Sequence, residues 1–163
     1  MPIMQLKLDE AKMKITLKSI GLLGKKAKEY AKKELGASAD DILLESQKRL
    51  YKNKSIAFSN LVNSGVIEEY DKGYTVAFRA SYAWAVEFGR KAGSIVTVEE
   101  LLPWVKKKLR INKKKDQERV AFFVSRAIFR FGTKAKPFFY PAYEKVIKGI
   151  SERIINAVMK GIR

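Results

Sequence analysis

The chain has 163 residues, with 34 Lys and Arg against 17 Asp and Glu, and it contains no Cys and no His. This length suits one domain with a real core, and a 47% hydrophobic content favours folding over disorder. The missing residue types exclude disulfides, thiolate zinc sites and a cysteine nucleophile, and they remove the commonest general base and metal ligand. We therefore expect no enzymatic activity, no metal site and no cofactor.

The net charge of +17 is spread unevenly along the chain. Residues 1–58 hold 13 basic and 7 acidic side chains, residues 59–98 hold 4 of each, and residues 99–163 hold 17 and 6. Basic ends of this kind suit a polyanion such as nucleic acid, and lysine-rich solubilisation explains them equally well. Since no apolar run approaches the ~20 residues of a membrane span, and the N-terminus is too charged for a secretory signal, we expect a protein made and kept in the cytoplasm, or in a particle assembled there.

The first 18 residues alternate between apolar and polar side chains in two short runs, residues 4–8 and 13–17. This period of two predicts an N-terminal strand hairpin over 1–18, with a helix starting at Asp9 as the alternative. From Ser19 the apolar residues recur at helical spacing, and Gly36 is predicted to end that helix. Ser38 is then predicted to cap a second helix.

The clearest hairpin in the sequence follows, with strands over residues 66–70 and 74–79 joined by a turn at 71–73. Residues 82–89 predict a short helix that ends at Gly89. Glu87 is the only acid among its apolar neighbours. A catalytic role is the alternative, but no second carboxylate, histidine or metal ligand is near, so we interpret Glu87 as a structural residue paired with a neighbouring Arg or Lys, for instance Arg90.

Residues 94–131 are predicted to form a helical insertion. Its first helix is capped by Thr97 or Ser94, and Pro103 is tolerable only in the first turn. The end of this helix and the following loop form a basic cluster that either complements the helix dipole or faces phosphates. The DNA-facing candidates are Lys106, Lys107, Lys108, Arg110, Lys113, Lys114 and Lys115.

The second helix of the insertion is predicted to open at Asp116. Its apolar residues at helical spacing predict a core stripe of Val120, Phe123, Val124, Ala127, Ile128 and Phe131. Phe122 and Phe129 fall on the opposite side, with Arg126 between them. Rings on an outer face need cover either from this subunit or from another one.

Residues 131–143 are punctuated by prolines and carry three consecutive rings. Gly132 can end the preceding helix, and Pro141 suits the first turn of the next. On an extended backbone the three rings alternate in direction, so at most one side faces the core of the subunit. The candidates for contacts between subunits or with partners are Trp84, Phe122, Phe129, Phe138, Phe139 and Tyr140.

A long C-terminal helix is predicted from the apolar stripe that runs from Tyr143 to Ile162, and we expect it to pack across the sheet. The whole chain, residues 1–163, is therefore predicted to be a single α+β domain, with a small antiparallel sheet packed against several helices.

Three stretches in this order resemble the minor tail or tail-completion (neck, head–tail joining) proteins of tailed double-stranded DNA phages and related prophages. They are Tyr82-Ala-Trp-Ala-Val-Glu-Phe-Gly89, like the family's YAxxVEFG; Leu101-Leu-Pro-Trp-Val-Lys-Lys-Lys-Leu109, like its L-x-x-W-V-x-x-K; and Gly132-Thr-Lys-Ala-Lys-Pro-Phe-Phe-Tyr-Pro-Ala142, like its GTxAxPFxxPA. The resemblance covers roughly residues 19–160. Leu61-Val-Asn-Ser64 departs from it, because the family's preceding Thr-Gly is replaced by Phe58-Ser59.

The resemblance implies a non-enzymatic virion protein, assembled in the host cytoplasm, that forms a homo-oligomeric ring between the head connector and the tail tube. DNA would pass through that ring with nonspecific contacts, and no membrane would be involved. The alternative is a free basic nucleic-acid-binding protein whose basic clusters form the binding surface.

Overall fold

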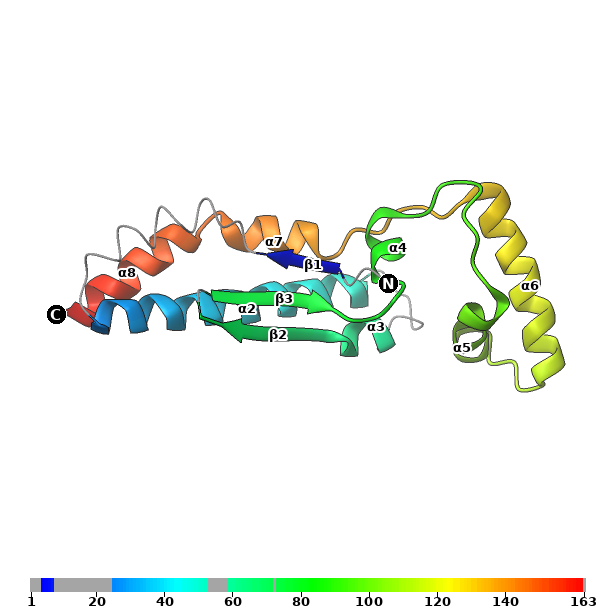
Figure 1. The fold of residues 1–163 in the computed structure, drawn as a ribbon, viewed down its shortest axis with the longest axis horizontal. Helices are drawn as coiled ribbons and strands as arrows, with labels where there is room; N and C mark the ends of the chain where they lie inside the picture. The colour runs from blue at the N-terminus through cyan, green and yellow to red at the C-terminus, as the bar shows by residue number, and fades with distance from the viewer. Residues whose placement is uncertain (1–3, 8–24, 53–58, 72, 163) are drawn as a thin grey trace.

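The computed structural model describes residues 4–7, 25–52, 59–71 and 73–162, and it shows an elongated molecule with two parts (Figure 1). The larger part, the body, holds a three-stranded sheet and five helices of the described chain. The smaller part, the arm, comprises residues 90–136 and projects from one end of the body. The body elements are β1 (Met4–Lys7), α2 (Lys25–Lys52), α3 (Ser59–Asn63), β2 (Gly65–Tyr70), β3 (Gly73–Phe78), α4 (Ala83–Phe88), α7 (Tyr140–Ile147) and α8 (Ile150–Ile162). The arm elements are α5 (Val98–Leu109) and α6 (Lys114–Phe131).

The sheet confirms the predicted α+β class. Its strands are antiparallel in the order β1-β3-β2, and β2 and β3 form the predicted hairpin, with Tyr70 paired to Gly73 beside the turn. β1 pairs along the other edge of β3, with Met4 opposite Phe78. The second strand predicted for the N-terminal hairpin, and the predicted helix start at Ser19, lie outside the described residues.

The predicted break in the first helix is wrong, because α2 runs without interruption through Gly36 and Ser38. The Ser38 hydroxyl does not cap a helix but donates to the carbonyl of Glu34, one turn back, at 2.9 Å. A Cβ on Gly36 would lie 3.1 Å from Cζ of Tyr74. Gly36 therefore makes room for a tyrosine ring of β3 and does not end the helix.

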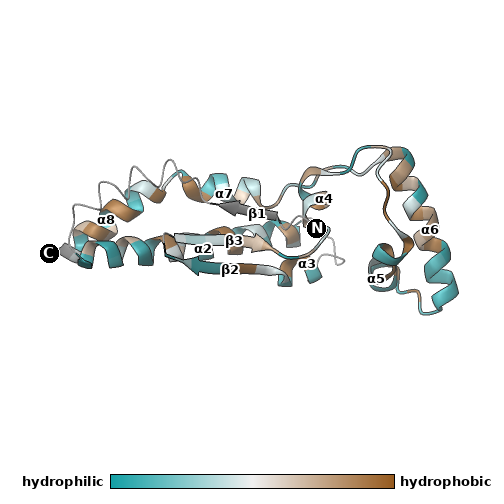
Figure 2. Cartoon of the chain, in the orientation of Figure 1, coloured by the Kyte–Doolittle hydropathy of each residue, from teal (hydrophilic) through white to brown (hydrophobic). Residues whose placement is uncertain are grey.

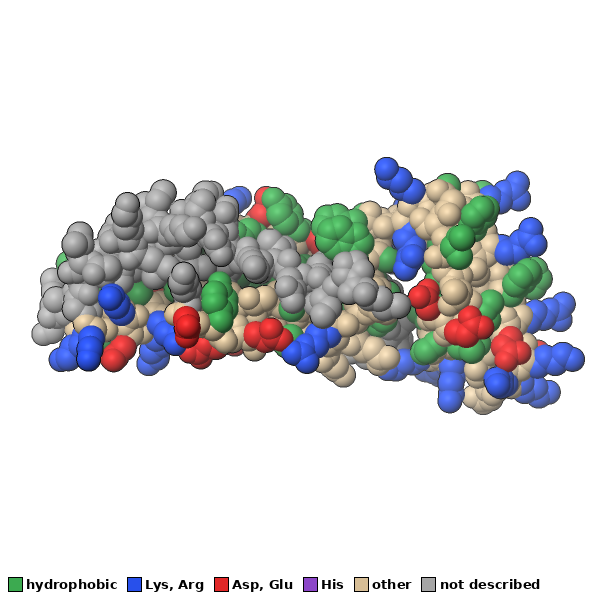
Figure 3. Space-filling model, viewed as in Figure 1, with side chains coloured by type: hydrophobic (Ala, Val, Ile, Leu, Met, Phe, Trp, Pro, Cys, Tyr) green, Lys and Arg blue, Asp and Glu red, His purple; other side chains and the backbone are tan. Residues whose placement is uncertain are grey.

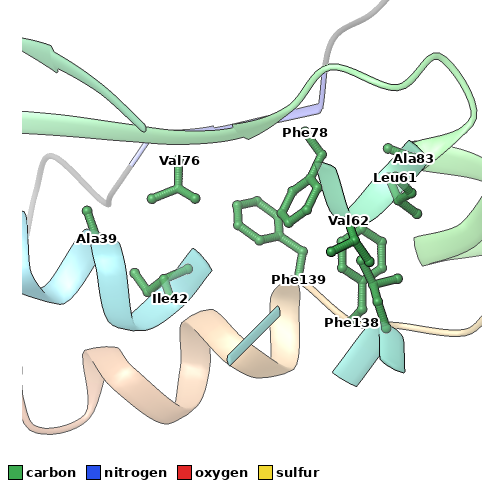
Figure 4. Close-up of a cluster of buried hydrophobic side chains, with 10 residues drawn as sticks. Ala39, Ile42, Leu61, Val62, Val76, Phe78, Ala83, Phe138 and Phe139 are labelled. Atoms are coloured by element: carbon green, nitrogen blue, oxygen red, sulfur yellow. The ribbon is translucent and has the colours of Figure 1, made fainter. Parts of the chain in front are cut away.

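The body core is centred on Phe78, at the end of β3 (Figure 4). Its ring meets Phe138 and Phe139 edge to face, with centroids 5.0 and 5.5 Å apart. This geometry is the favourable one for aromatic pairs. α2 and α3 close the cluster with buried aliphatic side chains, which include Ala39, Ile42, Leu50, Leu61 and Val62.

The predicted C-terminal stripe is divided between two helices, α7 and α8, which are separated at Lys148 and Gly149. α8 packs along α2 and not across the sheet as expected. Its buried side chains Ile150, Ile154 and Val158 meet Ala27, Ala31 and Leu35 of α2. α7 also lies against α2, so α2 is the element on which the C-terminal half of the body is built.

Three ionic contacts link this C-terminal part to α2. The Arg153 guanidinium donates to Glu34 and to Asp41, both at 2.7 Å. These two carboxylates raise the pKa of Arg153, which keeps the guanidinium charged. Lys145 of α7 donates to Glu45 at 3.1 Å.

The arm consists of two helices, α5 and α6, that pack against each other, in the stretch 94–131 predicted to be a helical insertion (Figure 1). Of the two predicted caps, Thr97 is the one observed, because its hydroxyl accepts from the amide of Glu100. Pro103 lies in the second turn of α5, not in the first as expected, and α6 begins at Lys114, before Asp116.

Candidate functional site

Glu87 fastens the base of the arm to the body. It is 2% exposed, and its carboxylate accepts three backbone amides: those of Phe138 and Phe139 on Oε2, at 2.8 and 2.9 Å, and that of Tyr140 on Oε1, at 2.9 Å. The structural interpretation of Glu87 is therefore confirmed, but the predicted kind of partner, a neighbouring Arg or Lys such as Arg90, is wrong. A carboxylate facing backbone amides makes charge-assisted bonds, which are stronger than neutral ones.

The predicted exposure of the aromatic segment 138–140 is wrong for two of its three residues, and the three hydrogen bonds to Glu87 show why. Phe138 and Phe139 are both fully buried in the body core, so neither presents a surface to another subunit. The alternation expected of an extended chain stops at Phe139, whose backbone is helical, with φ −88° and ψ −53°. Tyr140 comes next in the chain and remains half-exposed.

Two glycines shape the two segments, residues 89–90 and 132–133, through which the chain enters and leaves the arm. We call these two segments the neck of the arm. Arg90 and Thr133 exchange two backbone hydrogen bonds at 3.0 and 2.9 Å. Gly89 and Gly132, which directly precede Arg90 and Thr133 in the chain, have φ of 75° and 69°. A Cβ on Gly132 would lie 2.2 Å from the Arg90 carbonyl oxygen, and one on Gly89 would lie 2.5 Å from that of Thr133. Glycine at both positions therefore lets the two segments run in close contact.

Inside the arm, α6 buries a different face from the one predicted. The buried side chains of α6 are Gln117 and Ala121, which lie on the side of the helix that faces α5. Val105 of α5 and Val96, which precedes α5, are also buried. Two residues of the predicted core stripe are mostly exposed, Phe123 at 60% and Phe131 at 75%. A pair of helices has room to bury only one narrow stripe of each, so most of the rings of α6 remain outside.

The predicted outer rings of the arm do lie in solvent. Phe122 and Phe129 are each about half-exposed, and Arg126 places its guanidinium 5.7 Å from the Phe122 ring centroid. The three residues are spaced as one helical face, which does not include the buried Ala121. Arg beside aromatic rings is the composition enriched in protein–protein interfaces. Figure 2 shows the hydrophobic part of α6 toward the neck and a hydrophilic part at the far end of the arm.

A second exposed aromatic patch lies on α4, at the base of the arm. The rings of Trp84 and Phe88 are in contact, with centroids 4.2 Å apart and planes tilted by 45°, and the two residues are 53% and 55% exposed. They face away from Ala83 and Glu87, which are buried on the other side of the same helix. We call this pair the shoulder patch.

The seven basic candidates lie together at the end of the arm, in the arm tip, residues 106–115. All seven are exposed, and the stretch contains no acid. Lys107 donates to Asn60 of α3 at 3.1 Å, and Lys114 lies 3.9 Å from Glu118. Figure 3 shows basic side chains continuing along the outer side of the arm. The structure thus brings these candidates together, although it separates them from the aromatic ones.

Hydrogen bonds from Gln117, a residue that the sequence analysis did not single out, hold the loop of the arm tip in place. Its side-chain amide donates to the carbonyls of Ile111 and Asn112, at 2.6 and 3.4 Å, and it is 8% exposed. Arg110, at the end of α5, has a left-handed backbone with φ 53°. A polar residue at a core position of an amphipathic helix was the available signal in the sequence.

Clusters of three or more acidic side chains suited to a metal ion are absent from the described part of the chain. Within the same residues, no helix combines the length and apolar character of a membrane span. No family model, curated protein or solved structure matches this chain.

Proposed function

We propose that this protein is a non-enzymatic structural subunit of the virion of a tailed double-stranded DNA virus. In this proposal it forms a ring at the head–tail interface, and DNA passes through the ring. The observation that carries the proposal is the uncovered aromatic surface of the arm. Phe122 and Phe129 project from an element whose own helix pair cannot bury them, and large exposed apolar patches of this kind mark interaction sites.

The two exposed aromatic patches suit a contact between copies. The arm carries aromatic rings and arginine on α6, whereas the shoulder patch carries a pair of contacting aromatic rings on α4. In the proposed contact, the outer face of α6 of one copy packs on the shoulder patch of the next. Because the two surfaces differ, this contact is heterologous, and it closes into a ring when the rotation between copies divides a full turn.

The neck supports this role because it fixes the direction of the arm. Glu87 ties the segment that leaves the arm to the body core, and the bridge between Arg90 and Thr133 holds the two neck segments together. A contact at the arm is then transmitted to the body through hydrogen bonds and not through a free linker. The sequence resemblance to tail-completion proteins supports the same assignment, with the head connector and the tail tube proteins as neighbours.

The proposal is tested by light scattering and electron microscopy of the purified protein over a wide concentration range, in the absence of DNA. We expect closed rings of identical copies that form as the concentration rises. A protein that stays monomeric throughout, or that associates into open fibres, would contradict a ring-forming subunit.

A further inference from the structure

The arm tip differs chemically from the aromatic surfaces on which the proposed ring rests. It holds six lysines and one arginine within ten residues, and its described apolar side chains are Leu109 and Ile111. Lysine is depleted from the cores of protein–protein interfaces, where aromatic residues and arginine are enriched. The composition of the tip therefore argues against a protein surface as its partner.

The composition also separates a nucleic acid from a membrane surface. Helices that lie on membranes combine lysines with Trp, Phe or Leu on an adjoining apolar face, and the tip has no aromatic residue. The absence of aromatic side chains also argues against single-stranded nucleic acid, whose bases need aromatic platforms to stack on. A surface of lysines alone suits the phosphates of a duplex, since phosphate contacts by Lys and Arg carry nonspecific affinity.

Three lysines of the tip are exposed, and hydrogen bonds from Gln117 hold the loop of the tip. Lys108, Lys113 and Lys115 have no ion-pair partner among the residues that the structure describes. Gln117 pins the loop between the two helices through the carbonyls of Ile111 and Asn112. A loop fixed in this way loses less conformational entropy when it binds, which favours affinity at a given charge.

We propose that the arm tip is a binding surface for the phosphate backbone of duplex DNA, with no base sequence preference, and that Gln117 is the positioning residue that holds its basic loop. That the duplex is DNA rests on the proposed function. The α5–α6 loop of the tip lies at the end of the arm away from the neck (Figure 1), while Lys107 contacts Asn60 of the body. In a ring this loop would reach the DNA without involving the aromatic contacts.

The test measures the affinity of the full chain for a short DNA duplex as a function of salt concentration, using a variant with Lys108→Gln, Lys113→Gln and Lys115→Gln. The matched control carries Lys25→Gln, Lys28→Gln and Lys33→Gln on α2, which are three exposed lysines with the same total change in charge. We expect the tip variant to bind at least roughly tenfold more weakly, with a salt slope shallower by about 0.9 for each phosphate that it no longer neutralises. We expect the control to bind as the wild type does.

Three results would overturn the proposal. The tip variant could bind like the wild type, or the two triple variants could lose affinity equally, which would indicate net charge alone. The wild type could also bind phosphatidylserine vesicles as tightly as the duplex and through the same lysines, which would make a membrane the partner. None of these results affects ring formation, which is measured without DNA.

Gln117→Met tests the positioning role without changing charge. We expect weaker binding to the duplex with an unchanged salt slope, and an unchanged helical content by circular dichroism. Wild-type affinity in this variant would remove Gln117 from the proposal, and a change in slope would show that lysine contacts, not loop order, had been altered.

Discussion

Apart from Phe88 of the shoulder patch, the described phenylalanines occupy opposite environments in the two parts of the molecule. In the body, Phe78, Phe138 and Phe139 are fully buried and pack against one another. In the arm, Phe122, Phe123, Phe129 and Phe131 are all exposed by about half or more. The body can surround a ring with α2, α3 and the sheet, whereas the arm has only two helices. The body rings therefore stabilise the subunit, and the arm rings are available to another molecule.

The largest effect is expected when one aromatic ring is removed from each part of the molecule. Phe138→Ala should lower the free energy of unfolding by about 3–5 kcal/mol, because it leaves a cavity beside Phe78. Phe129→Ala, the matched change in the arm, should stay within about 0.5 kcal/mol of the wild type. Urea denaturation of both variants measures the difference. Similar losses in the two would show that the arm rings are part of the core.

The next largest effect is expected at the anchor between body and arm. In Glu87→Gln the new amide group would face a backbone donor, so at least one of the three hydrogen bonds is broken inside the core. We expect a loss of about 3 kcal/mol. Glu144→Gln makes the same change at an exposed position of α7 and should leave stability unaltered. Equal unfolding curves for the two variants would deny Glu87 its anchoring role.

A smaller effect is expected at the neck. Gly132→Ala places a methyl group 2.2 Å from the Arg90 carbonyl oxygen at a φ of 69°, and it should cost about 2–3 kcal/mol. Gly93→Ala has a similar φ of 88° but open space around it, so about 1 kcal/mol is expected for backbone strain alone. Thermal unfolding of both variants separates the cost of the steric contact from the cost of backbone strain. A cost at Gly93 as large as that at Gly132 would argue against a closely packed neck.

The smallest effect concerns pH. The hydrogen bond from Lys145 lowers the pKa of Glu45 from its ordinary value of 4.5. A carboxylate with a lowered folded-state pKa stabilises the fold above its unfolded-state pKa, and this contribution is lost as the pH falls through the folded value. Lys145→Gln should therefore reduce the loss of stability below about pH 4.5, by under about 1 kcal/mol because Lys145 is largely exposed. An identical pH profile would show that the pair contributes nothing.

The sequence predicted the body better than the arm, for reasons that particular residues make clear. The β2–β3 hairpin and α4 have local signals in a strand alternation, a turn and Gly89, and all of these are confirmed. Gly36 misled the prediction, because its role depends on Tyr74, a residue far away in the chain. The burial of both Phe138 and Phe139 depends in the same way on Glu87, which lies about fifty residues earlier.

In the arm, the helical period of α6 was predicted correctly but its buried face was not. The largest apolar residues were assigned to the core, whereas α5 covers the side with Gln117 and Ala121. Periodicity identifies a helix, and the partner element decides which face is buried. The exposure of Phe122, Phe129 and Trp84 and the clustering of the tip lysines did follow from the sequence, because these depend on spacing within single elements.

The claim that the arm joins subunits is tested most directly by the solution mass of Phe122→Ser/Phe129→Ser beside the wild type, measured by light scattering as the concentration rises and combined with each protein's Tm. We expect the wild type to assemble, and the double variant to remain a monomer with a wild-type Tm. A double variant that assembles as the wild type does, or one that loses its Tm together with its assembly, would contradict the account.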